Sequence, residues 1–246
     1  MRLAIISDIH SNLPALDAVL SEIEAGPPDE VWCLGDVVGY GAEPNECTSI
    51  VAERTTMCLA GNHDLAALDA IDISTFSPAA AAAAEWTRSE LSPESKTYLQ
   101  SLEPVDESRD VAAYHASPRD HVWEYVLWPE QAGECIASQP TRVALVGHSH
   151  VALCFRGADD GDVDATDGAQ MSADSVLDVS EGRWLLNPGS LGQPRDGDPR
   201  AAWLDLDTES WQATYRRVEY DIGKAADAIA QAGLPEHLGR RLFVGQ

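Results

Sequence analysis

The sequence lacks long hydrophobic runs. No apolar stretch approaches the roughly 18 residues that a membrane span requires, so we expect no membrane association. The apolar segment at residues 3–6 is followed at once by Ser7 and Asp8, and it is too short for the hydrophobic region of a secretion signal. We therefore expect no export and a cytoplasmic location.

Cysteine is sparse and scattered. None of the five cysteines forms a close-set pair with another, which argues against a disulfide framework and against a structural zinc site. Cys33 and Cys58 lie in strand-like segments, where buried free thiols are expected.

Positive charge is also scarce. The chain has 16 basic and 41 acidic residues and a formal net charge of -25. Binding to nucleic acid depends on contacts between cations and phosphates, so bulk nucleic-acid binding and nuclease activity are disfavoured. Hydrophobic residues make up an ordinary 44% of the chain, which argues against disorder. The acidic excess resembles the solvated surface of proteins from salt-loving organisms.

The sequence does contain a regular alternation of strands, loops and helices. Apolar runs predict strands at residues 2–7, 30–34, 55–60, 111–114 and 141–146, and helical spacing or start signals predict helices at 13–26, 44–54 and 129–138. This order indicates an α/β fold, in which ligands bind at the carboxyl ends of the strands. With neither repeat nor obvious linker, residues 1–246 are expected to form one domain.

Two segments stand apart from this alternation. An alanine-rich stretch and a second helix start predict two helices within residues 72–102, which either pack on the sheet or form a small helical cap. Residues 156–174 are acidic and poor in apolar groups, which predicts a flexible loop. A calcium loop starting at Asp160 is not expected, because Ala165 and Met171 replace the required glycine and glutamate.

Side chains that bind metals gather at the predicted strand ends. The turn Gly147-His148-Ser149-His150 follows a buried strand, although two histidines in a loop are by themselves more often solvated than metal-bound. Other polar residues also follow strands, namely Asp8, His10, Asp36, Asn62, His63 and His115. Carboxylate, amide and imidazole groups together match a site for two borderline divalent ions, with one carboxylate bridging.

These motifs resemble the calcineurin-like metallophosphoesterase superfamily. The motifs of that superfamily occur along this chain in the same order, as Asp8-Ile9-His10, Gly35-Asp36, Gly61-Asn62-His63-Asp64, His115 and Gly147-His148-Ser149-His150. The later Asn187-Pro188-Gly189-Ser190 resembles the single-domain bacterial and archaeal branch that includes YfcE-like phosphodiesterases. The resemblance implies a four-layer α/β/β/α sandwich with two mixed sheets.

The resemblance also implies roles for the strand-end residues. One divalent metal would be held by Asp8, His10, Asp36 and His150, and a second by Asp36, Asn62, His115 and His148. Manganese is expected first, with iron, zinc, nickel and magnesium as alternatives. The two ions would activate a hydroxide that attacks phosphorus in line. His63 would protonate the leaving oxygen or stabilise its charge, and Asp64 would either orient His63 or cap the following helix.

The expected activity is hydrolysis of a phosphodiester or phosphomonoester in a small substrate, with small nucleotides or related molecules slightly preferred. Protein phosphatases of the superfamily carry Asp-Arg where this chain has Gly39-Tyr40, which counts against that alternative. A non-catalytic scaffold of the same fold and a single-metal hydrolase also stay open, although His63 and the complete ligand set favour the dinuclear enzyme. A homo-oligomer is compatible with the sequence.

Three further polar residues are candidates for binding substrate. Arg195 and Arg119 could each reach a phosphate, but neutralisation by neighbouring acidic residues is the favoured interpretation for Arg195, and Arg119 has a similar balance. Asn12 could line the site, but capping of the helix at Leu13 is favoured. Trp123, Tyr125 and Trp128 could stack on a base or aryl ester, or pack in the core or at a dimer interface.

Overall fold

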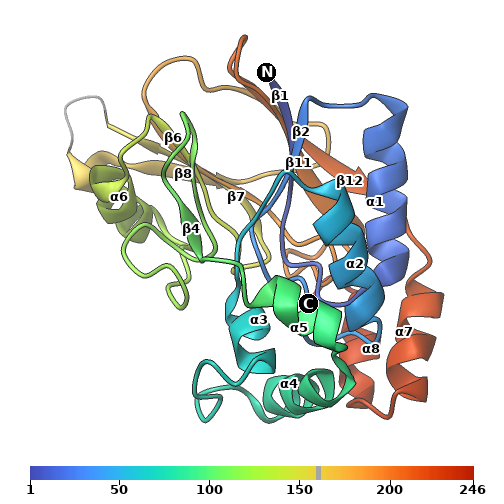
Figure 1. The fold of residues 1–246 in the computed structure, drawn as a ribbon. Helices are drawn as coiled ribbons and strands as arrows, with labels where there is room; N and C mark the ends of the chain where they lie inside the picture. The colour runs from blue at the N-terminus through green and yellow to red at the C-terminus, as the bar shows by residue number, and fades with distance from the viewer. Residues whose placement is uncertain (159–161) are drawn as a thin grey trace.

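Two mixed sheets of six strands each form the centre of the molecule (Figure 1). The computed structural model describes residues 1–158 and 162–246. In spatial order the first sheet contains β3 (Met57–Cys58), β2 (Glu30–Cys33), β1 (Arg2–Ile6), β11 (Ala201–Asp207), β12 (Gln212–Val218) and β9 (Val176–Asp178). The second contains β4 (Val105–Asp106), β5 (Ala112–Tyr114), β6 (Val143–Leu145), β10 (Arg183–Pro188), β7 (Ala152–Gly157) and β8 (Asp167–Gln170).

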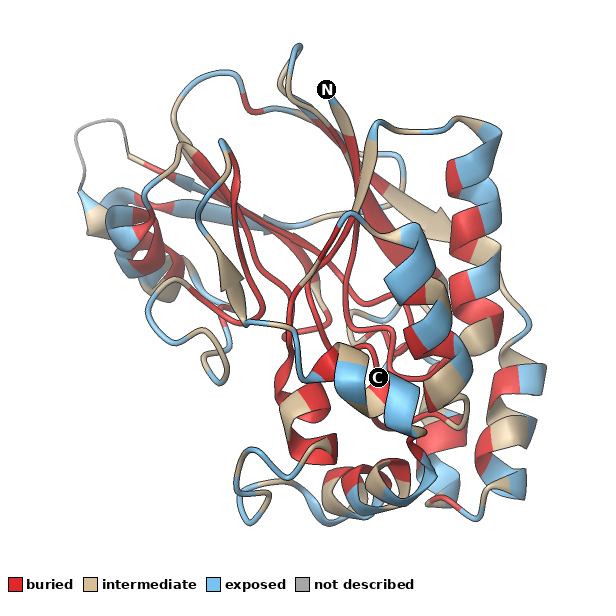
Figure 2. Ribbon diagram, in the orientation of Figure 1, coloured by how far each residue is buried: buried red, intermediate tan, exposed pale blue. Residues whose placement is uncertain are grey.

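Alternation along the strands separates two hydrophobic layers. In β1, Leu3 and Ile5 belong to the core between the two sheets, whereas Ala4 and Ile6 belong to the core beneath the helices of the first sheet. Successive side chains of a strand point to opposite faces, so a strand that is apolar throughout can be buried on both sides. In Figure 2 the buried residues accordingly run along the strands and the inner faces of the helices.

Helices cover the outer face of each sheet. Helices α1 (Leu13–Ala25) and α2 (Pro44–Arg54) lie outside the first sheet, and α6 (Pro129–Ser138) lies outside the second (Figure 1). The apolar face of α6 packs on the second sheet through residues that include Ala132 and Ile136. The predicted α/β/β/α sandwich with two mixed sheets is therefore confirmed.

The remaining helices gather at the end of the sandwich where the ligand-bearing loops lie. They are α3 (Asn62–Ala67), α4 (Pro78–Glu90), α5 (Pro93–Leu99), α7 (Ile222–Gln231) and α8 (Glu236–Leu242). One hydrophobic cluster joins Tyr40 to Ala80 and Ala83 of α4 and to Leu238 and Leu242 of α8. The two predicted helices of residues 72–102 are thus present as α4 and α5, and α4 is packed beside the C-terminal helices.

Several local predictions differ from the structure. Strand β3 has two residues rather than six, β10 includes Asn187 and Pro188 of the Asn187-Pro188-Gly189-Ser190 motif, and α3 was not predicted. Residues 156–174 are not loop throughout, because they contain the end of β7, a 3-10 turn at Val163–Ala165 and strand β8. Asp160, where the rejected calcium loop would begin, lies outside the described residues.

The structure bears on two further expectations, those for the cysteines and for membrane-spanning helices. All five cysteines are free thiols, and of these Cys58 alone is only partly buried. Over the two described ranges, no helix combines the length and the apolar character that crossing a bilayer would need.

Candidate metal centre and adjoining cavity

The loops that carry the predicted ligands converge because both sheets present the same strand ends. Strands β1, β2 and β3 are parallel neighbours, as are β5 and β6 in the other sheet. The loops after these strands therefore emerge at one end of the sandwich. There they bring together Asp8, His10, Asp36, Asn62, His115, His148 and His150.

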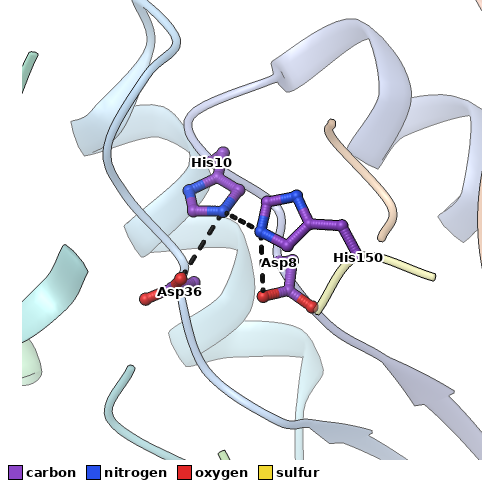
Figure 3. A group of neighbouring side chains, drawn as sticks. All are labelled: Asp8, His10, Asp36 and His150. Carbon is purple, nitrogen blue, oxygen red and sulfur yellow. Dashed lines mark hydrogen bonds and ion pairs between the residues drawn. The ribbon is translucent and has the colours of Figure 1, made fainter. Parts of the chain in front are cut away.

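The first group of converging ligands is Asp8, His10, Asp36 and His150, all buried (Figure 3). His10 Nε2 lies 3.5 Å from Asp36 Oδ2, and His150 Nε2 lies 3.5 Å from Asp8 Oδ1. One nitrogen or carboxylate oxygen from each residue lies within 4.8 Å of the others. Two carboxylates and two imidazoles at these separations suit a borderline divalent cation.

The second group shares Asp36 with the first and adds His115 and His148. His115 Nε2 is 3.6 Å from Asp36 Oδ2 and 3.2 Å from Asn62 Oδ1, so the Asn62 amide oxygen joins this group. All seven side chains predicted as ligands are therefore brought to one place, with the Asp36 carboxylate between the two groups.

Backbone carbonyls set the orientation of three of the imidazoles. The Nδ1 atoms of His10, His115 and His150 lie 3.0, 2.8 and 2.7 Å from the carbonyl oxygens of Val38, Leu34 and Gln193. Each Nδ1 is therefore placed to donate a proton to a carbonyl, and in a neutral ring this leaves a lone pair on Nε2.

The Nε2 lone pairs of His10 and His150 point at one another. His10 Nε2 and His150 Nε2 are only 3.0 Å apart, and with both Nδ1 atoms donating to carbonyls the two neutral rings cannot hydrogen bond to each other there. A cation held by both His10 and His150 would replace this repulsion with favourable contacts to each nitrogen.

Burial disfavours the charged forms of two carboxyl groups in the cluster. It raises the pKa of the Asp8 carboxyl to about 7, and together with the charge of Asp64 it raises the pKa of Asp36 well above its usual range. Within the described structure, Asp8 Oδ2, Asp36 Oδ2 and His148 Nε2 are buried without a hydrogen-bond partner. Buried polar groups are seldom left unpartnered, and cations bound by the two groups would satisfy all three atoms, so the donor set fits a metal centre.

The backbone at the ligands is held in an uncommon conformation. Five of the seven predicted ligands have left-handed φ angles between 50° and 62°, namely Asp8, His10, Asp36, His148 and His150. Such a conformation is unfavourable for residues other than glycine and concentrates at functional sites. Gly61 adds a close approach, because a Cβ there would overlap the Asp36 carboxylate.

His63 lies beside the ligand cluster but makes no hydrogen bond through Nδ1 within the described structure. Its ring packs against those of Tyr40, His10 and Phe76 at centroid distances of 4.3, 5.0 and 5.0 Å. Burial, with the charges of Arg195 and His115, lowers the pKa of His63 to about 3. The imidazole is therefore neutral near pH 7.

Asp64 acts on the backbone rather than on His63. Its two carboxylate oxygens accept hydrogen bonds from the N–H groups of Val38 and Gly61, at 3.0 and 2.8 Å. Of the two roles left open by the sequence, the geometry supports capping of α3. Its predicted catalytic role beside His63 has no hydrogen bond to His63 Nδ1 to support it in the described structure.

The three candidate substrate-binding residues lie in different environments. Arg195 faces a cavity, and the expected neutralisation by its neighbours is wrong, because Asp196 pairs with Arg217 and Asp198 with Arg200. Arg119 forms ion pairs with Glu124 and Glu134 and does not line that cavity.

Asn12 caps α1, as favoured from the sequence, since its side chain accepts from Ala15 N at 3.2 Å and donates to Gly192 O at 2.8 Å. Among the three aromatic candidates, Trp123 and Tyr125 line the cavity that Arg195 faces. Trp128 lines a separate apolar groove, and its side chain is 66% exposed.

The cavity opens beside the metal-binding cluster and has a volume of about 430 Å³. Its lining residues include Asn62, His63 and His148 of the cluster region, together with Tyr40, Thr75, Phe76, Ser77, Ala80, Trp123, Tyr125, Arg195 and Arg241. Sequence reasoning missed Arg241 and Phe76, which lie far from every motif. The pair Arg240-Arg241 in a strongly acidic chain was the available signal for the first of them.

This fold and this donor arrangement define a class, and the sequence comparison agrees with it. The chain belongs to the calcineurin-like phosphoesterase superfamily, whose domain model matches residues 1–209. An uncharacterized protein of Methanocaldococcus jannaschii is 37% identical over 249 residues, which covers 99% of this chain and 98% of that protein. The superfamily predicted from the motifs is confirmed.

Two further relatives differ in what they share with the chain. The crystal structure of a metallophosphoesterase from Sphaerobacter thermophilus has a TM-score of 0.90 and 40% sequence identity, covering 100% of this chain and 99% of that one. A symmetrical bis(5'-nucleosyl)-tetraphosphatase of Actinobacillus pleuropneumoniae is 34% identical over 64 residues, 25% of this chain and 24% of that enzyme. YfcE of E. coli is a structural neighbour at a TM-score of 0.43, too distant to support the finer branch placement.

Proposed function

We propose that this protein is a metal-dependent phosphoesterase that hydrolyses small phosphodiesters or phosphomonoesters with two divalent ions per chain. The observation that carries the proposal is the pair of buried donor groups that meet at Asp36. Manganese is the metal we expect first, and mixed carboxylate and imidazole ligands also suit iron, zinc and nickel.

We assign one ion to Asp8, His10, Asp36 and His150, and the other to Asp36, Asn62, His115 and His148. When bound, such a pair of ions supplies a nucleophilic water at neutral pH and neutralises charge on the phosphoryl oxygens. The carbonyls that hold the His10, His115 and His150 rings fix the direction of the donor atoms before any ion binds.

We assign His63 to the leaving group. Its ring lies at the boundary between the cluster and the cavity, and Tyr40 and Phe76 hold its plane. From there its N–H would donate to the oxygen on which negative charge develops as the ester bond breaks. Arg195, which lines the cavity, would bind a phosphate group of the substrate, whether the scissile group or one beside it.

A small substrate is favoured over a protein phosphoester. The cavity volume lies in the range typical of small-molecule sites. At the position where the related protein phosphatases carry an arginine, Tyr40 instead packs its ring on His10 and His63. The short similarity to an enzyme named for a dinucleoside tetraphosphate supports nucleotide-like substrates.

The test is turnover by metal-free protein reloaded separately with Mn, Zn, Mg and Ni. We expect hydrolysis of bis(4-nitrophenyl) phosphate, with 4-nitrophenyl phosphate cleaved more slowly. If no metal restores hydrolysis of either ester, the enzyme proposal fails and the scaffold alternative stands.

The leaving-group role of His63 has its own test. His63→Ala should lower kcat about 100-fold or more, and the loss should be larger for phenyl esters than for 4-nitrophenyl esters, because the poorer leaving group needs more help. His237→Ala, which changes an exposed histidine on α8, is the control. An equal loss on both esters would contradict the leaving-group role while leaving the metal centre intact.

A further inference from the structure

The lining of the cavity carries positive charge. Arg195 and Arg241 both line it, and none of the described residues around it is aspartate or glutamate. In a chain with 41 acidic and 16 basic residues, two arginines that share a cavity without a carboxylate are unusual. Most arginines of the described structure instead pair with acidic side chains, as Arg200 and Arg216 do.

Arg195 is held in place without being neutralised. Its Nη2 donates to Gln193 Oε1 at 3.2 Å and to Tyr40 Oη at 3.4 Å, and its guanidinium lies 5.7 Å from the centre of the Tyr40 ring. Its buried Nε has no hydrogen-bond partner in the described part of the chain. These neutral contacts orient the guanidinium without a direct ion pair, although its charge opposes the rise that burial causes in the pKa of Asp8 and Asp36.

Arg241 reaches the same cavity from α8, which follows the region matched by the family model. Its Nε donates to the main-chain oxygen of Gln246, the last residue of the sequence, and among the described side chains no aspartate or glutamate pairs with it. Burial and the nearby charge of Arg195 lower the pKa of Arg241, as expected for two cations that lie close together. Its neighbour Arg240 instead points to solvent, 3.7 Å from Glu236.

Aromatic rings supply another wall. Phe76 and Trp123 meet edge to face with centroids 5.8 Å apart, and Tyr125 stacks on the imidazole of His148 at 4.1 Å. Trp123 and Tyr125 are 38% and 43% exposed, so part of each ring is available to a ligand. The cavity thus combines aromatic surface and two guanidinium groups beside the cluster of metal ligands.

We propose that Arg195 and Arg241 form an anion subsite beside the metal ligands, and that the preferred substrate is a nucleotide carrying a second phosphoryl group next to the scissile one. The second phosphoryl group would be held by the two guanidinium groups, and the base would stack on Trp123. Because guanidinium groups bind phosphate through paired, charge-assisted hydrogen bonds, such a group would find both charge and geometry here. This inference rests on the proposed phosphoesterase function, since it concerns the substrate of that site.

The first test compares the binding of AMP and of the methylene-bridged analogue of ADP. Inhibition constants against bis(4-nitrophenyl) phosphate would be measured on the manganese-loaded protein, and affinities on the metal-free protein by calorimetry. The analogue should bind at least about tenfold more tightly than AMP, because it adds a phosphoryl group that both arginines contact. Arg241→Gln should reduce this preference to within about twofold, and Arg240→Gln, its exposed neighbour, should retain it.

The second test concerns the base. Trp123→Leu should abolish the preference for the methylene-bridged ADP analogue over methylenediphosphonate, whereas Trp128→Leu, in the separate groove, should retain it. Equal preferences in Arg241→Gln and Arg240→Gln would overturn the anion subsite, and equal preferences in the two tryptophan variants would overturn base stacking. Because calorimetry needs neither metal nor turnover, these outcomes are distinct from failure of the phosphoesterase proposal, which would appear as absent hydrolysis in the reloaded wild-type protein.

Discussion

At the scale of single residues, the candidate centre is built from side chains whose backbone is already constrained. Asp8, His10, Asp36, His148 and His150 all have left-handed φ angles, and carbonyl groups fix the rings of His10 and His150. Such a site loses little conformational entropy when a cation binds, because its ligands are held in place beforehand. The unfavourable backbone conformations are stabilised by the surrounding core.

The two histidines of the Gly147–His150 turn should have separable roles. His150→Ala should weaken the ion assigned to Asp8 and His10, and His148→Ala the ion assigned to Asn62 and His115. Each variant should weaken the affinity for its ion more than about tenfold, because even the loss of a residue that hydrogen-bonds to a metal ligand weakens metal binding about tenfold. Stepwise manganese titration by calorimetry measures both affinities. Identical defects in the two variants would contradict the division.

Gly39 allows the close packing of His63. Its φ is +93°, and an added Cβ would lie 2.6 Å from His63 Nδ1. Gly39→Ala should lower the free energy of unfolding by about 1–2 kcal/mol, because alanine is strained in a left-handed backbone conformation. The variant should also lower turnover at least about tenfold, because the added Cβ displaces His63.

The matched control is Gly233→Ala. Gly233 also has a positive φ, of +72°, but a Cβ added there would meet no described atom within 4 Å. This variant should show a similar loss of stability, measured by urea unfolding, with unchanged turnover. Equal turnover in the two variants would show that contact with His63 does not matter.

The sequence predicted the cluster of ligand types well but not the partners of individual polar residues. Aspartate and histidine at strand ends meet whenever parallel strands end together, so their convergence follows from topology. Arg195 was misjudged because its neighbours Asp196 and Asp198 pair with Arg217 and Arg200, and nothing local in the sequence reveals those pairings. Arg119 and Asp64 likewise depend on side-chain geometry that the pattern does not contain.

At the scale of elements, the loop between β10 and β11 carries Arg195 and is anchored by one buried ion pair. Arg217 of β12 pairs with Asp196, and their side chains are 3% and 0% exposed. Asp196 also accepts a hydrogen bond from Ala152 N at 3.2 Å, so this loop is tied to both sheets.

Removal of Arg217 should therefore destabilise the protein strongly. Arg217→Ala leaves Asp196 buried and unpaired, and we expect a loss of about 3–5 kcal/mol in urea unfolding. Arg200→Ala breaks a pair whose side chains are 40% and 28% exposed, and should lose about 0–1 kcal/mol. Similar losses in the two variants would show that the loop is not anchored in this way.

Most elements were predicted because apolar periodicity decides them. Helix α6 has the bounds that were expected, and α1 and α2 begin at their predicted positions. The exceptions are short or polar. Strand β8 has the exposed sequence Asp-Gly-Ala-Gln and exists because it pairs with β7, a long-range contact without a local signal. Helix α3 begins within the ligand motif, where polar residues concealed its pattern.

At the scale of the whole molecule, the net charge of -25 should oppose compactness at low ionic strength. Salt screens repulsion between exposed charges, so thermal unfolding in 2 M NaCl should occur at a higher temperature than in 0.1 M NaCl. Each kcal/mol gained should raise the Tm by about 2–4 °C for a chain of this size. Sucrose at matched osmolality is the control. An equal shift with sucrose, or none with salt, would contradict the predicted acidic surface effect.

Electron paramagnetic resonance of the manganese-loaded protein tests whether two ions share the Asp36 carboxylate. Two Mn ions bridged by one carboxylate are magnetically coupled, so the spectrum at two bound equivalents should differ from that of isolated Mn, and Asp36→Asn should remove the coupling. Two equivalents bound per chain with a coupled spectrum is the predicted result. Saturation at one equivalent, or two equivalents with the spectrum of isolated ions, would contradict the account.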